Sequence, residues 1–275
     1  MSMNIKYINS NGQTVNLNQY PYKMLISDIL DSEPDVIENN GRIIGFDNDI
    51  ITQREVNIDI HGTKTTSARA SLNDLTDIFA FDVATVIPGR LYINDWYIPC
   101  YFYGRETDRW QTDNIISCEY KLVTDHPSWI HEESHQFFAQ SSSSATAGGL
   151  DFPFDFPFDF AESKTGFEQW NIDHYASSHF NMTIYGPCED PRVLINGYPR
   201  QVFTSLEVNE YLVIDSQDST VIKHLANGTT VSVYNSRQFQ PSIFEKIPSG
   251  LLNIDWSGTF GFDITLYIER SEPKW

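Results

Sequence analysis

Cysteine and cationic side chains are scarce in this 275-residue sequence. The three cysteines, Cys100, Cys118 and Cys188, are widely spaced, which excludes a disulfide framework and a paired zinc motif and fits folding in a reducing cytosol. Lysine and arginine number 18 against 37 aspartates and glutamates, which gives a formal net charge of −19. A protein that binds nucleic acid or anionic membranes needs a basic face, so this balance argues against both classes.

Long apolar runs are absent as well. No stretch reaches the roughly 20 apolar residues of a membrane-spanning helix, and the N-terminus has no apolar signal core. We therefore expect a soluble protein without membrane contact that is not exported by the usual route. Apolar residues nevertheless make up 40% of the chain and aromatic residues 14%, which suffices for real cores and argues against disorder.

An unusual strip, residues 150–160, repeats the unit Asp-Phe-Pro-Phe after a run of small and serine residues at 141–149. Its two prolines exclude a regular helix, and an extended chain would place its five phenylalanines on one face. We expect the strip to pack against a folded domain and the serine-rich run to act as a hinge. The chain is therefore predicted to consist of an N-terminal domain, a hinge with the strip, and a C-terminal domain, at 1–140, 141–160 and 161–275.

The N-terminal part combines strands with one helix. Residues 65–67 offer N-caps for a helix whose apolar face is formed, at helical spacing, by Ala68, Leu72, Leu75 and Phe79. Residues 91–93 and 96–98 are rich in strand formers and flank Asn94-Asp95, which predicts a hairpin. The polar segment 31–40 is expected to be a loop.

Beyond the strip the pattern becomes entirely β. Short apolar segments alternate with turn formers such as Asn196-Gly197 and Asn227-Gly228 at a spacing of roughly 8–12 residues. This spacing predicts a β-sandwich. The pairing of such strands is mostly non-local, so their order does not follow from the sequence.

One stretch matches a zinc-binding motif. Residues 131–135 match H-E-x-x-H, which on a helix would place His131 and His135 on one face to bind zinc, with Glu132 as the base. Pro127 and Trp129 precede this stretch and a serine run follows it, so any helix is short, and no third ligand is evident downstream. We interpret the stretch as a polar structural segment.

The aspartates of the strip do not form a calcium site in extended geometry. Four residues of extended chain span roughly 13 Å, whereas calcium ligands lie within about 2.6 Å of one ion. The sequence also lacks a G-x-S-x-G motif and a phosphate-binding loop. We therefore predict that the protein is not an enzyme and has no catalytic residue, no cofactor-binding residue and no metal site.

A likeness to a known family rests on five C-terminal segments: YLVID at 211–215, NGT at 227–229, FEKIPSG at 244–250, NIDWSG at 253–258 and ERSEPKW at 269–275. The N-terminal order of strand, amphipathic helix, hairpin and HPSW at 126–129, followed by the Asp/Phe/Pro strip, adds to it. In this order the segments resemble the distal tail (Dit) proteins of long-tailed, non-contractile bacteriophages. The likeness covers nearly the whole chain.

The resemblance implies a mainly β fold. The N-terminal domain would be a β-sandwich or barrel-like domain with one α-helix and a projecting hairpin, and the C-terminal domain a galectin-like or carbohydrate-module-like β-sandwich. It also implies a non-enzymatic structural role in the virion, at the tail tip, after assembly in the cytoplasm of the bacterial host.

The partners are likewise implied by the resemblance. Six copies would form a baseplate hub ring that joins the tail tube to the tail-associated lysin and the receptor-binding proteins. The genome would pass through the lumen of this ring without specific binding.

A second function stays open at this point. The chain could be a carbohydrate-binding protein or a module of a glycosidase, with a host surface glycan as ligand, if the C-terminal sandwich exposes aromatic side chains such as Trp170 or Trp256. A galectin-like fold does not by itself establish sugar binding, since one fold hosts unrelated functions.

A ring needs a contact in which one surface meets a different surface on the next copy. The hairpin at 91–102 carries more aromatic side chains than one small domain usually buries, and exposed aromatic patches commonly mark contacts with a partner. The predicted inter-subunit contact residues are Tyr92, Trp96, Tyr97, Tyr101 and Phe102.

The charge balance predicts no measurable affinity for double-stranded DNA at physiological salt. Nonspecific affinity comes mainly from cations that neutralise phosphates, and acidic residues outnumber basic ones here by 37 to 18. A gel-shift assay at micromolar protein should show only free DNA. A shifted band that weakens as the salt concentration rises would contradict this expectation.

Overall fold

The computed structural model describes residues 3–25, 30, 35–47, 51–62, 66–112, 114–140 and 166–274. The serine-rich run and the Asp-Phe-Pro strip lie outside these residues. The chain forms two compact units: unit 1 comprises Met1–His131 and Glu269–Trp275, and unit 2 comprises Glu132–Ile268. The segment Glu269–Trp275 thus belongs to unit 1, and the limits 1–140, 141–160 and 161–275 stay a prediction.

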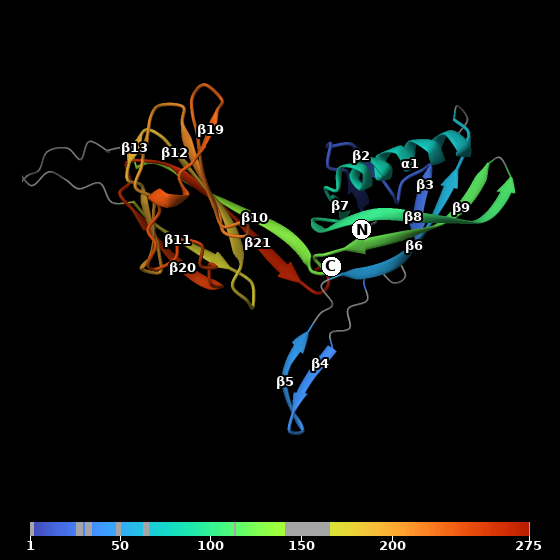
Figure 1. Cartoon of the computed structure of the whole chain (residues 1–275), viewed down its shortest axis with the longest axis horizontal. Helices are drawn as coiled ribbons and strands as arrows, with labels where there is room; N and C mark the ends of the chain where they lie inside the picture. The colour runs from blue at the N-terminus through green and yellow to red at the C-terminus, as the bar shows by residue number, and fades with distance from the viewer. Residues whose placement is uncertain are drawn as a thin grey trace, which may run out of the picture. The chain divides into compact units, whose positions relative to one another are not determined.

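Unit 1 consists of paired strands and one long helix that packs on three of them. Strand β8 is shared by two runs of neighbouring strands, β2-β1-β7-β8 and β3-β6-β9-β8, and α1 packs on β6, β8 and β9 (Figure 1). The elements are β1 (Ile5–Ile8), β2 (Thr14–Asn16), β3 (Tyr22–Leu25), β4 (Asp35–Asn39), β5 (Arg42–Asp47), β6 (Thr52–His61), α1 (Ala68–Thr85), β7 (Gly89–Ile93), β8 (Trp96–Thr112) and β9 (Ile115–Thr124).

The predicted helix is confirmed as α1. Ser67 is its N-cap, and the Ser67 hydroxyl accepts a hydrogen bond from the backbone N–H of Ala70 at 3.3 Å. All four residues of the predicted apolar face are buried. Phe79 packs the helix against two strands: its ring stacks on Phe102 of β8 at 4.2 Å and meets Tyr7 of β1 edge-on at 5.1 Å. No helix of the described chain is long and apolar enough to cross a bilayer.

A buried carboxylate ties α1 to the N-terminal strands. Asp82 has no exposed surface, and it accepts hydrogen bonds from the Tyr7 hydroxyl at 2.6 Å, the Ser10 hydroxyl at 2.6 Å and the Ser10 N–H at 2.7 Å. Burial raises the pKa of Tyr7 far above its ordinary value, so this phenol stays a donor. Gly89 lies against the pair, since a Cβ there would overlap the Tyr7 hydroxyl.

The hairpin predicted at residues 91–98 is confirmed. Strands β7 and β8 pair with Ile93 opposite Trp96, and Asn94 turns the chain at φ 54°.

The loop predicted at residues 31–40 is wrong for the residues described there. Residues 35–39 form β4, which pairs with β5 around Asn40 and Gly41, both at positive φ. Asn-Gly between two apolar segments is a strong hairpin signal.

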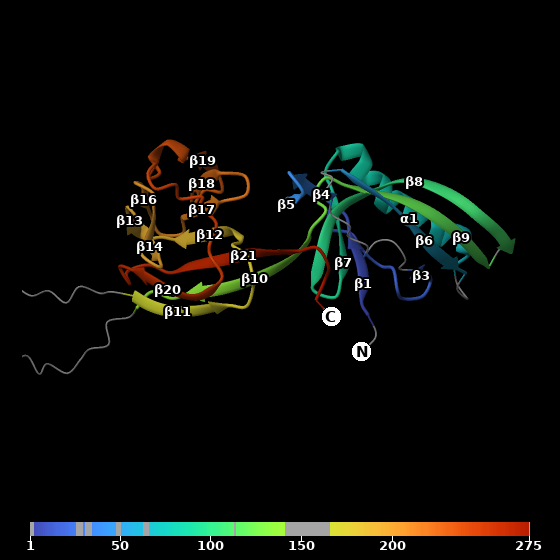
Figure 2. The ribbon, with the colours of Figure 1, turned by 90° about the horizontal axis from the view of Figure 1, so that it is seen from below.

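Unit 2 is a β-sandwich whose layers can be followed in Figure 2. One sheet has the order β19-β18-β17-β12-β21-β10, the other the order β11-β20-β14-β15, and β13 pairs with β16. The elements are β10 (Trp129–Phe137), β11 (Gly166–Ile172), β12 (His179–Tyr185), β13 (Cys188–Glu189), β14 (Arg192–Ile195), β15 (Tyr198–Gln201), β16 (Ser205–Leu206), β17 (Tyr211–Asp215), β18 (Thr220–His224), β19 (Thr230–Ser232), η2 (Tyr234–Ser236), β20 (Gly250–Trp256) and β21 (Phe262–Arg270).

Aromatic rings from both sheets fill the core of unit 2. Phe137 of β10 stacks on Phe262 of β21 at 4.6 Å and meets Trp256 of β20 at 5.9 Å. The indole of Trp256 donates a hydrogen bond to the carbonyl of Phe260 at 3.0 Å, so its polar atom is satisfied inside the core. The predicted mainly β fold, with one long helix and sandwiched sheets, is confirmed.

Replacing Asp82 by alanine should lower the free energy of unfolding by about 3 kcal/mol, because the Tyr7 hydroxyl and the Ser10 N–H lose a buried acceptor. Urea denaturation of the full-length protein measures the change. Asp77→Ala removes an exposed carboxylate from the same helix and is the matched control, with an expected effect within about 0.5 kcal/mol. If both variants lose the same free energy of unfolding, the buried hydrogen bonds of Asp82 contribute no more to stability than an exposed carboxylate does.

Candidate interaction surfaces

The H-E-x-x-H stretch forms no metal site of the expected kind. Residues 131–135 belong to strand β10, so the helical face that would bring the two imidazoles together does not form. His131 Nδ1 lies 3.2 Å from the carbonyl of Asp95, and His135 Nε2 lies 2.7 Å from the carboxylate of Glu168. No group of three His, Cys, Asp or Glu residues suited to a metal occurs in the described parts of the chain.

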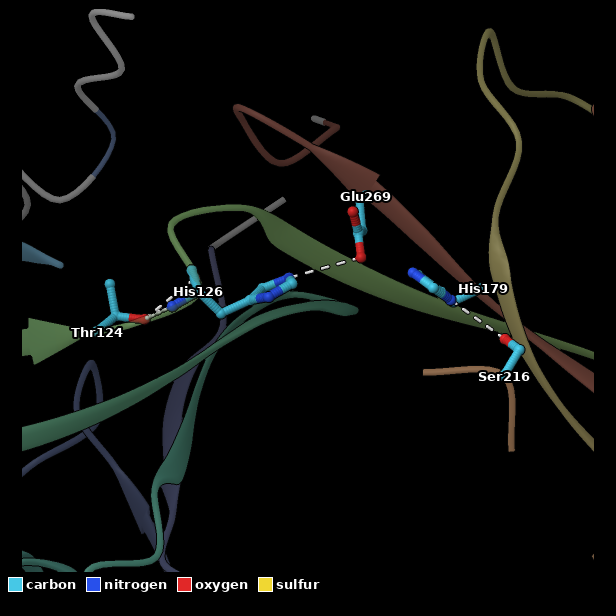
Figure 3. A network of polar contacts seen from close by, with 5 residues as sticks. All are labelled: Thr124, His126, His179, Ser216 and Glu269. Carbon is cyan, nitrogen blue, oxygen red and sulfur yellow. Dashed lines mark hydrogen bonds and ion pairs between the residues drawn. The ribbon is translucent and has the colours of Figure 1, made fainter. Parts of the chain in front are cut away.

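Two further histidines have polar partners, drawn in Figure 3. In unit 1, His126 Nε2 lies 3.6 Å from the Glu269 carboxylate, while its backbone N–H donates to the Thr124 hydroxyl at 3.0 Å. In unit 2, His179 Nδ1 lies 3.2 Å from Ser216 Oγ. Ser216 is only 4% exposed, and its hydroxyl accepts a hydrogen bond from the backbone N–H of Phe180. This hydroxyl therefore stabilises the sheet.

The five predicted contact residues differ in accessibility. Trp96, Tyr97 and Phe102 are buried within the chain, whereas Tyr92 and Tyr101 are half-buried. Lys6 lies over the Tyr92 ring at 4.6 Å. An inter-subunit contact through these residues stays a prediction, and only Tyr92 and Tyr101 offer surface to it.

The β4–β5 hairpin was missed by the sequence reasoning and exposes apolar side chains. Among the described strands, β4 and β5 pair only with each other. Four large aliphatic residues, which occur on both faces of this ribbon, are between 41% and 63% exposed: Val36, Ile37, Ile43 and Ile44. An isolated two-stranded hairpin is marginally stable in water, so these side chains are suited to contact a partner.

A groove lies between α1 and the β8–β9 hairpin, and we call it the α1 groove. Its volume is about 420 Å³, and its lining includes Thr76, Ala80 and Val83 of α1, Tyr103 and Arg105 of β8, and Tyr120 of β9. Arg105 Nη1 donates to the Thr76 hydroxyl at 3.1 Å. The Tyr120 hydroxyl is buried against these two side chains and makes no hydrogen bond of ordinary geometry.

The two tryptophans named for glycan binding are not exposed. Trp170 and Trp256 are 7% and 5% exposed, so the expectation that they form an aromatic surface is wrong. They face the sandwich core, where Trp170 also stacks on His135 at 5.2 Å. The exposed aromatic residues of unit 2 include Tyr234 and Phe239, whose ring centres lie 3.5 Å and 4.3 Å from the Arg237 guanidinium.

Three solved structures are similar to nearly the whole chain. A chain of the phage P2 baseplate in its activated conformation with calcium superposes with a TM-score of 0.63 at 12% identity, covering 99% of this chain and 100% of that chain. The same baseplate with strontium gives a TM-score of 0.61 at 13% identity, with the same coverage. Dit of phage SPP1, described as a paradigm of the hub adsorption apparatus in phages that infect Gram-positive bacteria, gives 0.50 at 8% identity, covering 98% and 100%.

The chain has the Dit fold. The resemblance inferred from the sequence is therefore confirmed at the level of the fold. No family model matches the sequence, and no curated protein matches it.

Within this Dit fold, α1 ends in an unusual way. Val86 adopts the left-handed conformation, at φ 56° and ψ 36°, and its side chain is 77% exposed. Glycine normally occupies such a position, because a β-branched residue is strained there. Val83 and Ile87 are also exposed, so an apolar surface continues from the α1 groove past the end of the helix.

Replacing Val86 by glycine should raise the free energy of unfolding by about 1 kcal/mol, because the left-handed strain disappears. Urea denaturation again measures the change. Val83→Gly, three residues earlier inside the helix, is the matched control and should lower the free energy of unfolding by about 1 kcal/mol. Destabilisation by both glycines would mean that Val86 is not strained.

Proposed function

We propose that this chain is a non-enzymatic structural protein of a phage tail tip. In this role it is a distal tail protein: six copies form a hub ring that joins the tail tube to the tail-associated lysin and the receptor-binding proteins. The protein is assembled in the bacterial cytoplasm and resides in the virion.

The observation that carries this proposal is the extent of the structural likeness. The match to the P2 baseplate chain covers 99% of this chain and 100% of the other, so it includes both units. A shared sandwich alone would be weak support, because sandwiches host unrelated functions.

The surface chemistry supports assembly rather than catalysis. The β4–β5 hairpin and the end of α1 present aliphatic side chains that the described chain does not cover. The net charge of −19 suits a ring through which DNA passes without binding. The C-terminal unit, for which we propose a galectin-like sandwich, buries the two tryptophans that would have favoured a carbohydrate-binding function.

The full-length protein at high concentration should form rings of six copies around one axis, as detected by native mass spectrometry and negative-stain electron microscopy. The physical reason is that a contact between two different surfaces closes into a ring when its rotation is a fraction of a full turn. Monomers or two-fold dimers at every concentration, together with the lack of a six-fold ring in virions, would overturn the proposal.

A further inference from the structure

We propose that the α1 groove of one copy holds the β4–β5 hairpin of the next copy. This inference rests on the proposed ring and identifies the contact that closes it. The hairpin and the groove are different surfaces of the same unit, so their union is a heterologous contact, as a ring requires.

The hairpin supplies the apolar half of the contact. Val36 and Ile37 are adjacent in β4 and therefore point to opposite faces. In β5 the pairing shifts at Ile44, which has no partner in the register, and both Ile43 and Ile44 are exposed. Both faces of the ribbon are thus apolar. Its turn is a compact Asn40-Gly41 pair, which lets the ribbon enter a narrow space.

The α1 groove supplies a matching surface. Ala80 and Val83 form an apolar wall, and Val83 is 43% exposed. Val86 follows at the helix end in a left-handed conformation and adds another exposed aliphatic side chain three residues beyond Val83.

A charged group at the groove completes the match. The Tyr120 hydroxyl is buried against Arg105 and Thr76, and burial raises its pKa to about 12, so it keeps its proton. Arg105 keeps further N–H donors beyond the one used by Thr76. The hairpin brings an acceptor, because Glu38 of β4 is an exposed acidic side chain.

Disulfide cross-linking of full-length protein tests this contact. Cys100 and Cys118 are buried, and Cys188→Ser removes the third thiol. Any cross-link between copies is therefore formed by the introduced cysteines. A chain that carries both Ile44→Cys and Val83→Cys should give, under mild oxidation, a ladder of covalent oligomers that ends at six copies. An equal mixture of the two single variants should stop at dimers. Leu251→Cys replaces Val83→Cys in the control chain, because Leu251 is an aliphatic residue of unit 2 that is 56% exposed against 43% for Val83, and no ladder should form.

A charge in the groove provides a second readout. Val83→Glu should weaken self-association at least about tenfold, because the hairpin would bury an unpaired carboxylate. Leu251→Glu should change it less than about twofold. If six-fold rings form but no ladder appears and Val83→Glu has no effect, the contact is wrong and the proposed function stands. If the unmodified chain never associates and virions show no six-fold ring, both the contact and the ring are refuted.

Discussion

A fully buried carboxylate stays in place only where hydrogen-bond donors replace its water. Asp82 meets this condition through Tyr7 on β1 and Ser10 in the turn that follows, so the last turns of α1 are fastened to the N-terminal strands. The stacked ring of Phe79 fixes the same helix on β8. The α1 groove and the strained end at Val86 both depend on where this helix lies.

In its described residues, unit 2 is stabilised mainly by apolar packing and not by a buried carboxylate network. Its sheets are held together by aromatic and aliphatic side chains, and even a buried cation is packed against a ring: Arg200 lies 4.9 Å from the ring centre of Phe180. Burial lowers the pKa of Arg200 to about 10, and the guanidinium donates to the carbonyl of Glu245 at 2.8 Å. Exposed apolar side chains occur in both units, whereas the α1 groove and the β4–β5 hairpin belong to unit 1.

Local signals were sufficient for α1 and for the β7–β8 hairpin. Helical spacing with a serine N-cap, and strand formers around a turn, act within a few residues, so the sequence predicts them directly. The β4–β5 hairpin does not follow from the same reading, although its Asn40-Gly41 turn signal is equally local. The polar residues of 31–40 favour a loop when they are considered without Gly41 and the strand that follows it.

The exposure of side chains could not be predicted in the same way. Trp170 and Trp256 look alike in sequence to any exposed aromatic residue, and only the pairing of distant strands decides that they face the core. The α1 groove has the same origin, since Tyr120 and Arg105 approach α1 only after β8 and β9 have paired. Surfaces that depend on long-range packing therefore require the structure.

The most direct test of the tail-tip assignment is the position of the protein in the phage particle. Gold-labelled antibodies raised against the purified full-length protein can be applied to intact virions and observed by electron microscopy. The assignment predicts label at the distal end of the tail, on the particles and not on separated heads. Label on the capsid, label along the tail shaft, or virions without the protein would contradict it.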